Sequence, residues 1–194
     1  MLDTTNHPDL DADAKAKLLE TISNSPVTLT MNGELDDEDG IRLNASLPGD
    51  CIFGIEISRH LDPNHIVAFS DWLRVPSDLR GHHIGERLVR TSTVAAKEAG
   101  ATILRGIIQN EAALRIRARV FGEANLRFFD IGEDDEIDGE PRELHITYQE
   151  AYDELQKAGL TEKDPENRQF GFMVDVNLED IDTTGWERAN LTKL

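Results

Sequence analysis

The sequence predicts an α/β fold of the α+β kind, in which a mixed, mostly antiparallel sheet is flanked by helices. The main observation is the order of the elements: short alternating segments separated by turns come first, and strand, helix, strand, helix and strand follow. A second is the Arg- and Gly-containing turn at residues 75–85, which joins an apolar run to a helical pattern. The third is size, since 194 residues with 39% hydrophobic content can bury one good core.

The N-terminal part predicts one helix and an antiparallel meander. Residues 9–22 carry apolar side chains at helical spacing, and Asp11 is a suitable cap at their start. Pro26 ends this pattern. Alternating apolar and polar residues, separated by polar turns, then predict four strands. These segments are residues 27–31, 41–47, 51–58 and 66–75.

Helical and apolar segments alternate in the second half of the chain. Residues 86–100 and the alanine-rich stretch after Asn110 predict helices, and Gly100 can cap the first of them. Residues 149–158 predict a further helix. The segments expected as strands are residues 101–108, 124–131, 143–147 (as the last core strand) and 170–176.

The chain is strongly acidic, with a net charge of −18. Such a field repels nucleic-acid phosphates, so we expect no nucleic-acid partner. A negative field suits a cationic amine substrate. The alternative explanations of the negative charge are solubility and a saline cytoplasm.

The lack of a long apolar run, the polar N-terminus and the single cysteine, Cys51, predict a cytoplasmic protein with no membrane partner. Despite the negative net charge, five basic residues cluster in one stretch of the sequence. They can bind the phosphates of a cofactor, and the alternative is that they form ion pairs along a helix. They are Arg105, Arg115, Arg117, Arg119 and Arg127.

The turn at residues 75–85 is a candidate anion site. Backbone N–H groups at a helix N-terminus are unpaired and converge, and the helix dipole adds positive potential there. We therefore expect the turn to hold a phosphate, most simply the pyrophosphate of a cofactor. The alternative is an ordinary strand–turn–helix connection, in which glycine only allows the chain to turn.

The residues around this turn, L73-R74-V75-P76 and R80-G81-H82-H83-I84-G85-E86, resemble the acyl-CoA signature of the GNAT superfamily of N-acyltransferases. That signature is Arg or Gln, two residues, Gly, one residue, and Gly or Ala; Arg80, Ile84 and Gly85 fit it. His83 stands at the first Gly, where we expect an ordinary backbone conformation, with a reshaped loop or weaker binding. The resemblance implies that the cofactor is acetyl-CoA or another acyl-CoA. The residues it assigns to the cofactor are Leu73, Arg74, Val75, Arg80, Gly81, His82, His83, Ile84, Gly85, Glu86 and Asn110.

The segment from Asn110 resembles the second motif of the family: Asn after the fifth strand, an alanine-rich helix and a Gly-Phe pair, here reversed as Phe121-Gly122. In the family, the Asn side chain contacts the pantetheine arm, and a Tyr seven residues later often serves as the general acid. The corresponding residue here is Arg117, which cannot deliver a proton at neutral pH. The resemblance covers roughly residues 52–147, and it implies that the backbone of residues 73–75 pairs with the pantetheine amides.

Two side chains are candidates for the proton transfers of acyl transfer to an amine. Asp71 lies on the strand that enters the turn; alternation places it on one face with Phe69 and Leu73, and it is the candidate base. The alternative is that Asp71 faces solvent beside Trp72. Tyr148, after the expected last core strand, is the candidate acid, and half-buried packing with a wet hydroxyl is the alternative.

These observations predict an enzyme: an N-acyltransferase that moves an acetyl or other acyl group from acyl-CoA to a small-molecule or protein amine by direct attack. The alternatives are a catalytically inactive GNAT-like binding module and an enzyme that uses the turn for another phosphorylated ligand. The resemblance also suggests a homodimer. No metal site is expected, because neither the histidines nor the acidic residues 134–138 complete a ligand set.

The expected organisation has three parts. Residues 1–26 contain the N-terminal helix, and residues 27–158 form the GNAT-like acyltransferase domain. Residues 159–194 form a C-terminal extension that packs on the domain or on a partner.

Overall fold

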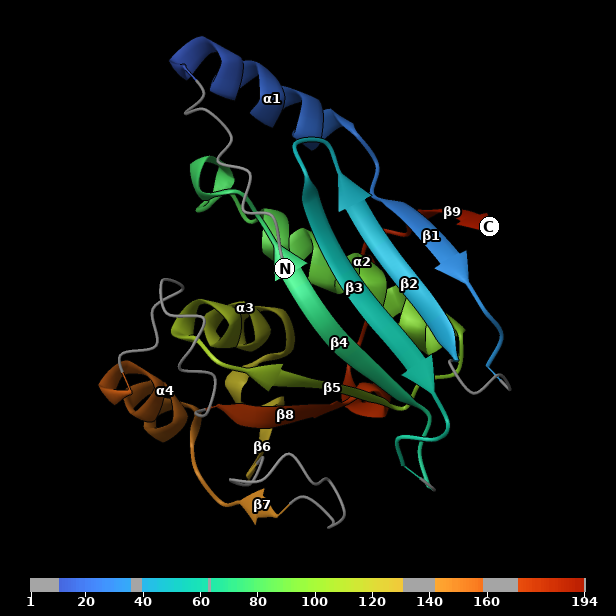
Figure 1. The fold of residues 1–194 in the computed structure, drawn as a ribbon, viewed down its shortest axis with the longest axis vertical. Helices are drawn as coiled ribbons and strands as arrows, with labels where there is room; N and C mark the ends of the chain where they lie inside the picture. The colour runs from blue at the N-terminus through green and yellow to red at the C-terminus, as the bar shows by residue number, and fades with distance from the viewer. Residues whose placement is uncertain (1–10, 36–39, 63, 131–141, 159–170, 194) are drawn as a thin grey trace, which may run out of the picture.

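Nine strands of the described part of the chain form one sheet (Figure 1). The computed structural model describes residues 11–35, 40–62, 64–130, 142–158 and 171–193. The strands are β1 (Thr28–Asn32), β2 (Ile41–Leu47), β3 (Cys51–Ser58), β4 (Val67–Arg74), β5 (Ile103–Ile108), β6 (Arg127–Asp130), β7 (Glu143–Leu144), β8 (Phe172–Asn177) and β9 (Asn190–Lys193). The α-helices are α1 (Ala12–Asn24), α2 (Ile84–Glu98), α3 (Glu111–Phe121) and α4 (Tyr148–Lys157). Three short 3-10 helices are η1 (Ser77–Leu79), η2 (Glu123–Asn125) and η3 (Leu178–Asp180).

The order of strands across the sheet is β7-β6-β8-β5-β4-β3-β2-β1-β9. Most neighbours are antiparallel, and the parallel pairs among the described strands are β4–β5 and β1–β9. The predicted fold class, a mixed and mostly antiparallel sheet flanked by helices, is therefore confirmed.

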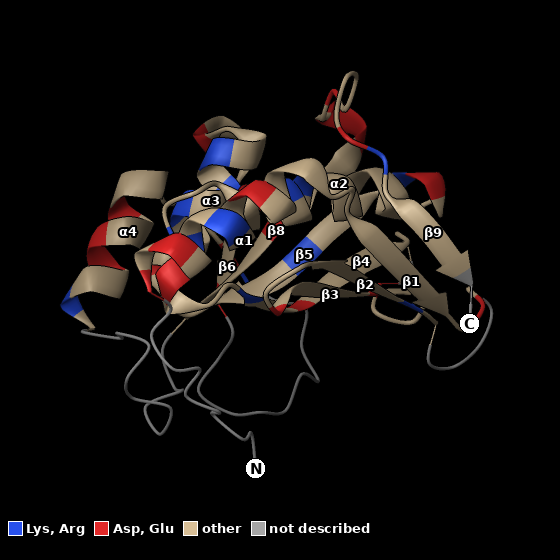
Figure 2. Ribbon diagram, turned by 90° about the horizontal axis from the view of Figure 1, so that it is seen from above, with Lys and Arg blue, Asp and Glu red and all other residues tan. Residues whose placement is uncertain are grey.

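Helices α2 and α3 pack against the sheet on one of its sides (Figure 2). The apolar side of α2, with Leu88 and Val89 buried, lies on β2 and β3. In β3, Phe53, Ile55 and Ile57 alternate with other residues and form the matching core surface. No described helix combines the length and the apolar character that crossing a membrane requires.

The last core strand is not at residues 143–147, and the alternating segment expected as a strand at residues 170–176 occupies the interior of the sheet as β8. Residues 143–147 were expected to form the last core strand, but only the two residues of β7 pair, at the edge of the sheet. Strand β8 lies between β5 and β6 in the sheet, and its Val174 is fully buried. Asp175 within β8 accepts two hydrogen bonds from Arg105 of β5, at 2.8 and 2.7 Å, so a carboxylate is tolerated inside the sheet. Residues 159–194 thus contribute β8 to the interior of the sheet and β9 to its other edge.

A bulge in β4 changes the direction of the side chains that follow it. Two adjacent residues of β3 pair with Ser70 and Trp72, so Asp71 is the extra residue of the bulge. Alternation predicted that Asp71 and Leu73 share the face of Phe69. This expectation is wrong, because the inserted residue shifts the register and places Leu73 on the face of Ser70.

Candidate functional site

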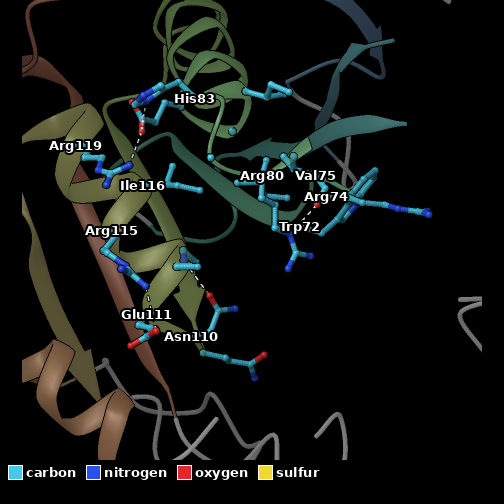
Figure 3. A pocket seen from close by; sticks show the side chains of 18 of the residues that line it. Trp72, Arg74, Val75, Arg80, His83, Asn110, Glu111, Arg115, Ile116 and Arg119 are labelled. Carbon is cyan, nitrogen blue, oxygen red and sulfur yellow. Dashed lines mark hydrogen bonds and ion pairs between the residues drawn. The ribbon is translucent and has the colours of Figure 1, made fainter. Parts of the chain in front are cut away.

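A cavity of about 1220 Å³ opens between β4, β5 and the N-terminal ends of α2 and α3 (Figure 3). It exists because the two parallel strands separate. Their pairing runs from Val67 opposite Ile103 to Ser70 opposite Gly106 and then stops, although both strands continue within the described part of the chain. The residues of β4, the turn and α2 that line the cavity are Asp71, Trp72, Leu73, Arg74, Val75, Leu79, Arg80, Gly81, His83, Ile84, Gly85 and Glu86. Those of β5, α3 and α4 are Ile107, Gln109, Asn110, Glu111, Ala112, Ala113, Arg115, Ile116, Arg119, Leu155 and Gln156.

The edge of β4 that faces the cavity can pair with an extended ligand. Beyond Ser70, β5 no longer pairs with this edge, so its backbone groups have no strand partner there. The carbonyl of Val75 is engaged locally, since it accepts from Arg80 Nε at 3.1 Å. Residues 71–74 therefore offer an edge for strand-like hydrogen bonding.

His83 adopts a left-handed backbone conformation, with φ 60° and ψ 14°. The expectation of an ordinary conformation here is wrong: His83 keeps the geometry that glycine takes easily, and His is among the non-glycine residues enriched in this region. The first backbone bond of α2 runs from the Arg87 N–H to the His83 carbonyl, at 3.0 Å. The N–H groups of Ile84, Gly85 and Glu86 therefore have no acceptor within the helix.

The basic side chains at this end of the cavity are paired with carboxylates. His83 Nδ1 lies 3.0 Å from Glu86 Oε1, and Arg119 Nη1 donates to the same oxygen at 3.1 Å (Figure 3). Partial burial opposes ionisation of Glu86, but the hydrogen bonds from His83 and Arg119 outweigh it and hold the pKa of this carboxyl below its usual value. Arg115 donates to Glu111 at 3.1 Å. An anion that binds at the α2 N-terminus must therefore compete with Glu86.

Gly85 allows α2 to approach its neighbours closely. A Cβ atom there would lie 3.0 Å from Ile116 Cδ1 of α3 and 3.4 Å from Leu73 Cδ2 of β4. A side chain at this position would therefore require Ile116 and Leu73 to move. Gly85 thus allows the start of α2 to pack closely on these two side chains, both of which line the cavity.

Asn110 fixes the start of α3 beside the cavity. Its side-chain oxygen accepts from the Ala113 N–H at 2.9 Å, which is a helix N-cap. The amide nitrogen at the other end of the group points away from the helix (Figure 3). Asn110 can therefore cap α3 and donate to a ligand carbonyl at the same time.

The cavity has lining residues from both faces of the sheet. Leu73 and Ile116 lie on the side covered by helices. Trp72 lies on the opposite side, against Gly54, where a Cβ atom would come within 2.9 Å of the indole nitrogen. Trp72 and Ile107 are each 45% exposed. The gap between β4 and β5 thus joins a helix-covered space to the open face of the sheet.

Two of the predicted site residues are not among the cavity-lining residues. His82 is exposed and lies outside the lining. Tyr148 is the first residue of α4, stacked on Tyr152 with ring centroids 6.0 Å apart, and burial raises the pKa of its phenol. From α4, only Leu155 and Gln156 line the cavity. The short β7 explains the position of Tyr148, since the chain enters α4 where a longer strand was expected.

The predicted basic cluster divides over several environments. Arg115 and Arg119 lie on the exposed side of α3, where Figure 2 shows the helix banded in blue. Arg117, between them, is buried, because residues two apart on a helix face opposite ways. Arg105 and Arg127 form ion pairs with acidic residues of the sheet strands, at 2.7 and 2.6 Å.

Metal ligands do not gather in the part of the chain that the structure describes, where no group of three suitable side chains occurs. The acidic residues 134–138 lie outside that part. Comparison of the chain with protein-family models, with curated proteins and with solved structures gave no match.

Proposed function

We propose that this protein is an N-acyltransferase, which takes an acetyl or other acyl group from acyl-CoA and transfers it to an amine. The observation that carries the proposal is the gap between the parallel strands β4 and β5. It combines an unpaired strand edge, a helix N-terminus with open N–H groups, and the carboxylate of Asp71 around one cavity. Residues 73–86, which enter and form the turn before α2, also resemble an acyl-CoA signature in sequence.

An acyl-CoA suits the shape and the polar groups of the cavity. Its pantetheine arm is extended and carries amides, which can pair with β4 at residues 71–74 and with the amide nitrogen of Asn110. Its diphosphate suits the N–H groups at the start of α2. Arg80 and Gly81, also in the lining, lie in the turn before this helix.

The chemistry follows from Asp71 at the bulge of β4. The amine nitrogen attacks the thioester carbonyl, a C–N bond forms, and the C–S bond breaks with its electron pair on sulfur. Asp71, which is exposed and lines the cavity, accepts the proton that the amine loses, directly or through water. Backbone N–H groups of the β4 edge near residues 73–75 are suited to stabilise the tetrahedral oxyanion. The thiolate takes its proton from solvent, since Tyr148 is not part of the lining.

A cationic amine also suits the charge of the protein. With a net charge of −18, the chain attracts cations from solution before they reach the cavity. On the open face of the sheet, Trp72 and Ile107 flank the gap and provide an apolar surface for the body of the acceptor.

A binding module without catalysis is the second candidate, and Glu86 is the observation that favours it. Its carboxylate occupies the charged end of the cavity and already pairs with His83 and Arg119. A ligand with fewer phosphates, or a protein partner, meets less repulsion there than CoA does.

The proposal is tested by thiol release from acetyl-CoA in the presence of a panel of primary amines. Asn110→Asp keeps a good helix cap but replaces the amide donor with a carboxylate, so we expect KM for acetyl-CoA to rise by about tenfold. Asp11→Asn makes the reverse exchange at the cap of α1, outside the cavity lining, and should leave KM unchanged. Binding of acetyl-CoA without turnover with any amine would exclude the transferase and favour a module that has kept the cofactor site. Absence of binding to the folded protein would also exclude the transferase, and would favour a module for another ligand or a protein partner.

A further inference from the structure

The guanidinium of Arg117 is buried between α3 and the sheet, at the point where β4 and β5 separate. Arg117 is 5% exposed, and its Nη2 donates to Ser70 Oγ. None of the described residues accepts a hydrogen bond from Nη1. Asp175, the acidic residue that acts on this charge, has its own ion pair with Arg105 at 2.7 Å.

Gly106 makes this position available. A Cβ atom on Gly106 would overlap both Ser70 Oγ and Arg117 Nη2. Ser70 and Gly106 are also the last residues that pair β4 with β5. Serine, glycine and arginine together therefore place a cation at the point from which the two strands diverge.

A buried cation with an unused donor is unfavourable on its own. Removing a charge from water is costly unless a counter-charge and hydrogen bonds replace the solvent. Burial lowers the pKa of Arg117 to about 10, so the group stays protonated at neutral pH. The protein thus holds a positive charge in a buried region, where the low effective dielectric constant strengthens its interaction with other charges.

The surrounding residues place this charge behind the inner end of the cavity, since neither Arg117 nor Ser70 is among the lining residues themselves. Along α3, Asn110, Ala113 and Arg117 are spaced by three and four residues and so share one side of the helix. The first two line the cavity, and Arg117 lies one turn beyond them. Asp71 and Ile107, which line the cavity from the two strands, directly follow the last paired residues.

We propose that Arg117 and Ser70 stabilise the negative charge that acyl transfer places on the sulfur of CoA. This inference rests on the proposed function. As the C–S bond breaks, its electron pair stays on sulfur, and the amine proton goes to Asp71 or water. Ser70 Oγ accepts from Arg117, so the hydroxyl can use its own proton to donate toward the sulfur. Arg117 acts through Ser70 and is a positioning residue, and the sulfur is protonated by solvent after release.

Stabilisation of the thiolate can be measured from the affinities for CoA and acetyl-CoA, without knowledge of the acceptor. CoA has a free thiol, whereas acetyl-CoA has none. If the site stabilises a thiolate, the affinity for CoA relative to acetyl-CoA rises with pH, by about tenfold for each unit by which binding lowers the thiol pKa. The other charged groups beside Ser70 and Arg117 are Asp71 on β4, Arg105 on β5 and Asp175 on β8. Their charges act on both ligands, so the acetyl-CoA measurement serves as the reference.

Calorimetric titrations of both ligands between pH 6 and pH 9, roughly spanning one thiol titration, test the inference. We expect the affinity ratio to rise by about tenfold in the wild type and in Arg117→Lys, which keeps the charge. Arg117→Gln should abolish the rise and Ser70→Ala should reduce it. Arg119→Gln, on the exposed side of the same helix, should retain it.

Some results would overturn the role of Arg117 alone, and one would overturn the proposed acyl-CoA site as well. An affinity ratio that does not change with pH in the wild type, while both ligands bind, overturns the role of Arg117 and leaves the acyl-CoA site standing. The same holds if Arg117→Gln keeps the full rise. Failure of the folded wild type to bind either ligand overturns the proposed function as well.

Discussion

Arg119 and Arg117 lie two residues apart on α3, and their surroundings are opposite. Arg119 lines the outer end of the cavity, and Arg117 lies behind its inner end. The Arg119 side chain is 60% exposed and shares Glu86 with His83. Arg117 is buried and bonded only to a neutral hydroxyl among the described residues. The outer end therefore has exposed charges that are paired, and the region behind the inner end has a buried charge without an ion pair among the described residues.

The comparison shows how one helix builds two electrostatic environments. Successive residues of α3 point in different directions, so a run of basic residues in the sequence does not form one basic surface. Ion pairs of exposed residues contribute little to stability, whereas a buried charge has a large effect on its surroundings. We therefore expect changes at the inner end to have larger consequences than similar changes at the outer end.

Gly106→Ala should be the most destabilising change. The added Cβ overlaps Ser70 Oγ and Arg117 Nη2 in a buried place, so the guanidinium must move, at a cost of about 1–3 kcal/mol. Gly54→Ala is the control, because its Cβ meets the half-exposed Trp72, which can shift toward solvent. Urea unfolding of both variants measures the difference. Equal stabilities would mean that the inner end is not packed as described.

Arg117→Met should raise stability and lower activity. Replacing a buried charge by an apolar side chain of similar length is often neutral or stabilising, by about 1–4 kcal/mol. The same change at Arg119 should alter the free energy of unfolding by less than about 1 kcal/mol, since its ion pair is largely exposed. Thermal unfolding and thiol release of the two variants separate the roles. A destabilised Arg117→Met protein would indicate that the guanidinium is a structural group.

Glu86→Gln should tighten acetyl-CoA binding by about 3- to 10-fold, since it removes a carboxylate that competes with the ligand for the side chains of His83 and Arg119. Glu111→Gln, which removes the partner of Arg115, is the matched control and should have a smaller effect. Weaker binding in Glu86→Gln would show that the carboxylate positions Arg119 for the ligand instead.

The stability of the protein should also depend on pH through Glu86. Its folded-state pKa lies below the ordinary value of 4.5, so its contribution is complete above that value and is lost as pH falls through the folded-state pKa. Glu86→Gln should lack this part of the acid destabilisation. Unfolding measured along an acid series compares the variant with the wild type, and identical acid profiles would contradict the assignment.

The smallest expected effect is the difference in stability between two variants of His83. His83→Ala and His83→Gly both remove the imidazole, but only alanine retains a Cβ in the left-handed conformation. We expect the alanine variant to be less stable by about 1 kcal/mol. Chemical unfolding measures this difference. A more stable alanine variant would mean that the turn has a different backbone in solution.

The order of elements was predictable because it depends on local patterns. Alternation located β2 and β3 with the bounds that the structure has, and Asp11 was identified as the cap of α1. The central strand β8 was harder to place. Which strands become neighbours depends on long-range pairing, and the partner that makes Asp175 acceptable, Arg105, lies 70 positions away in the sequence.

The candidate site was predictable where it depends on one turn and its neighbours. Asp71, His83 and Asn110 lie around one cavity, as their places beside the expected turn and helices suggested. The bulge at Asp71 and the left-handed His83 were missed, because simple alternation and residue preference assume regular backbone. The burial of Arg117 was missed as well, although its position between Arg115 and Arg119 on a helix already implied an opposite direction.

Amide hydrogen exchange with and without acetyl-CoA tests the central claim, that the separated edge of β4 binds an acyl-CoA. We expect saturating acetyl-CoA to slow exchange at residues 71–75 and at the start of α2, because these N–H groups acquire acceptors from the ligand. The amides of β1, between β2 and β9, should not change. Unchanged exchange at residues 71–75 in the presence of saturating ligand would contradict the account.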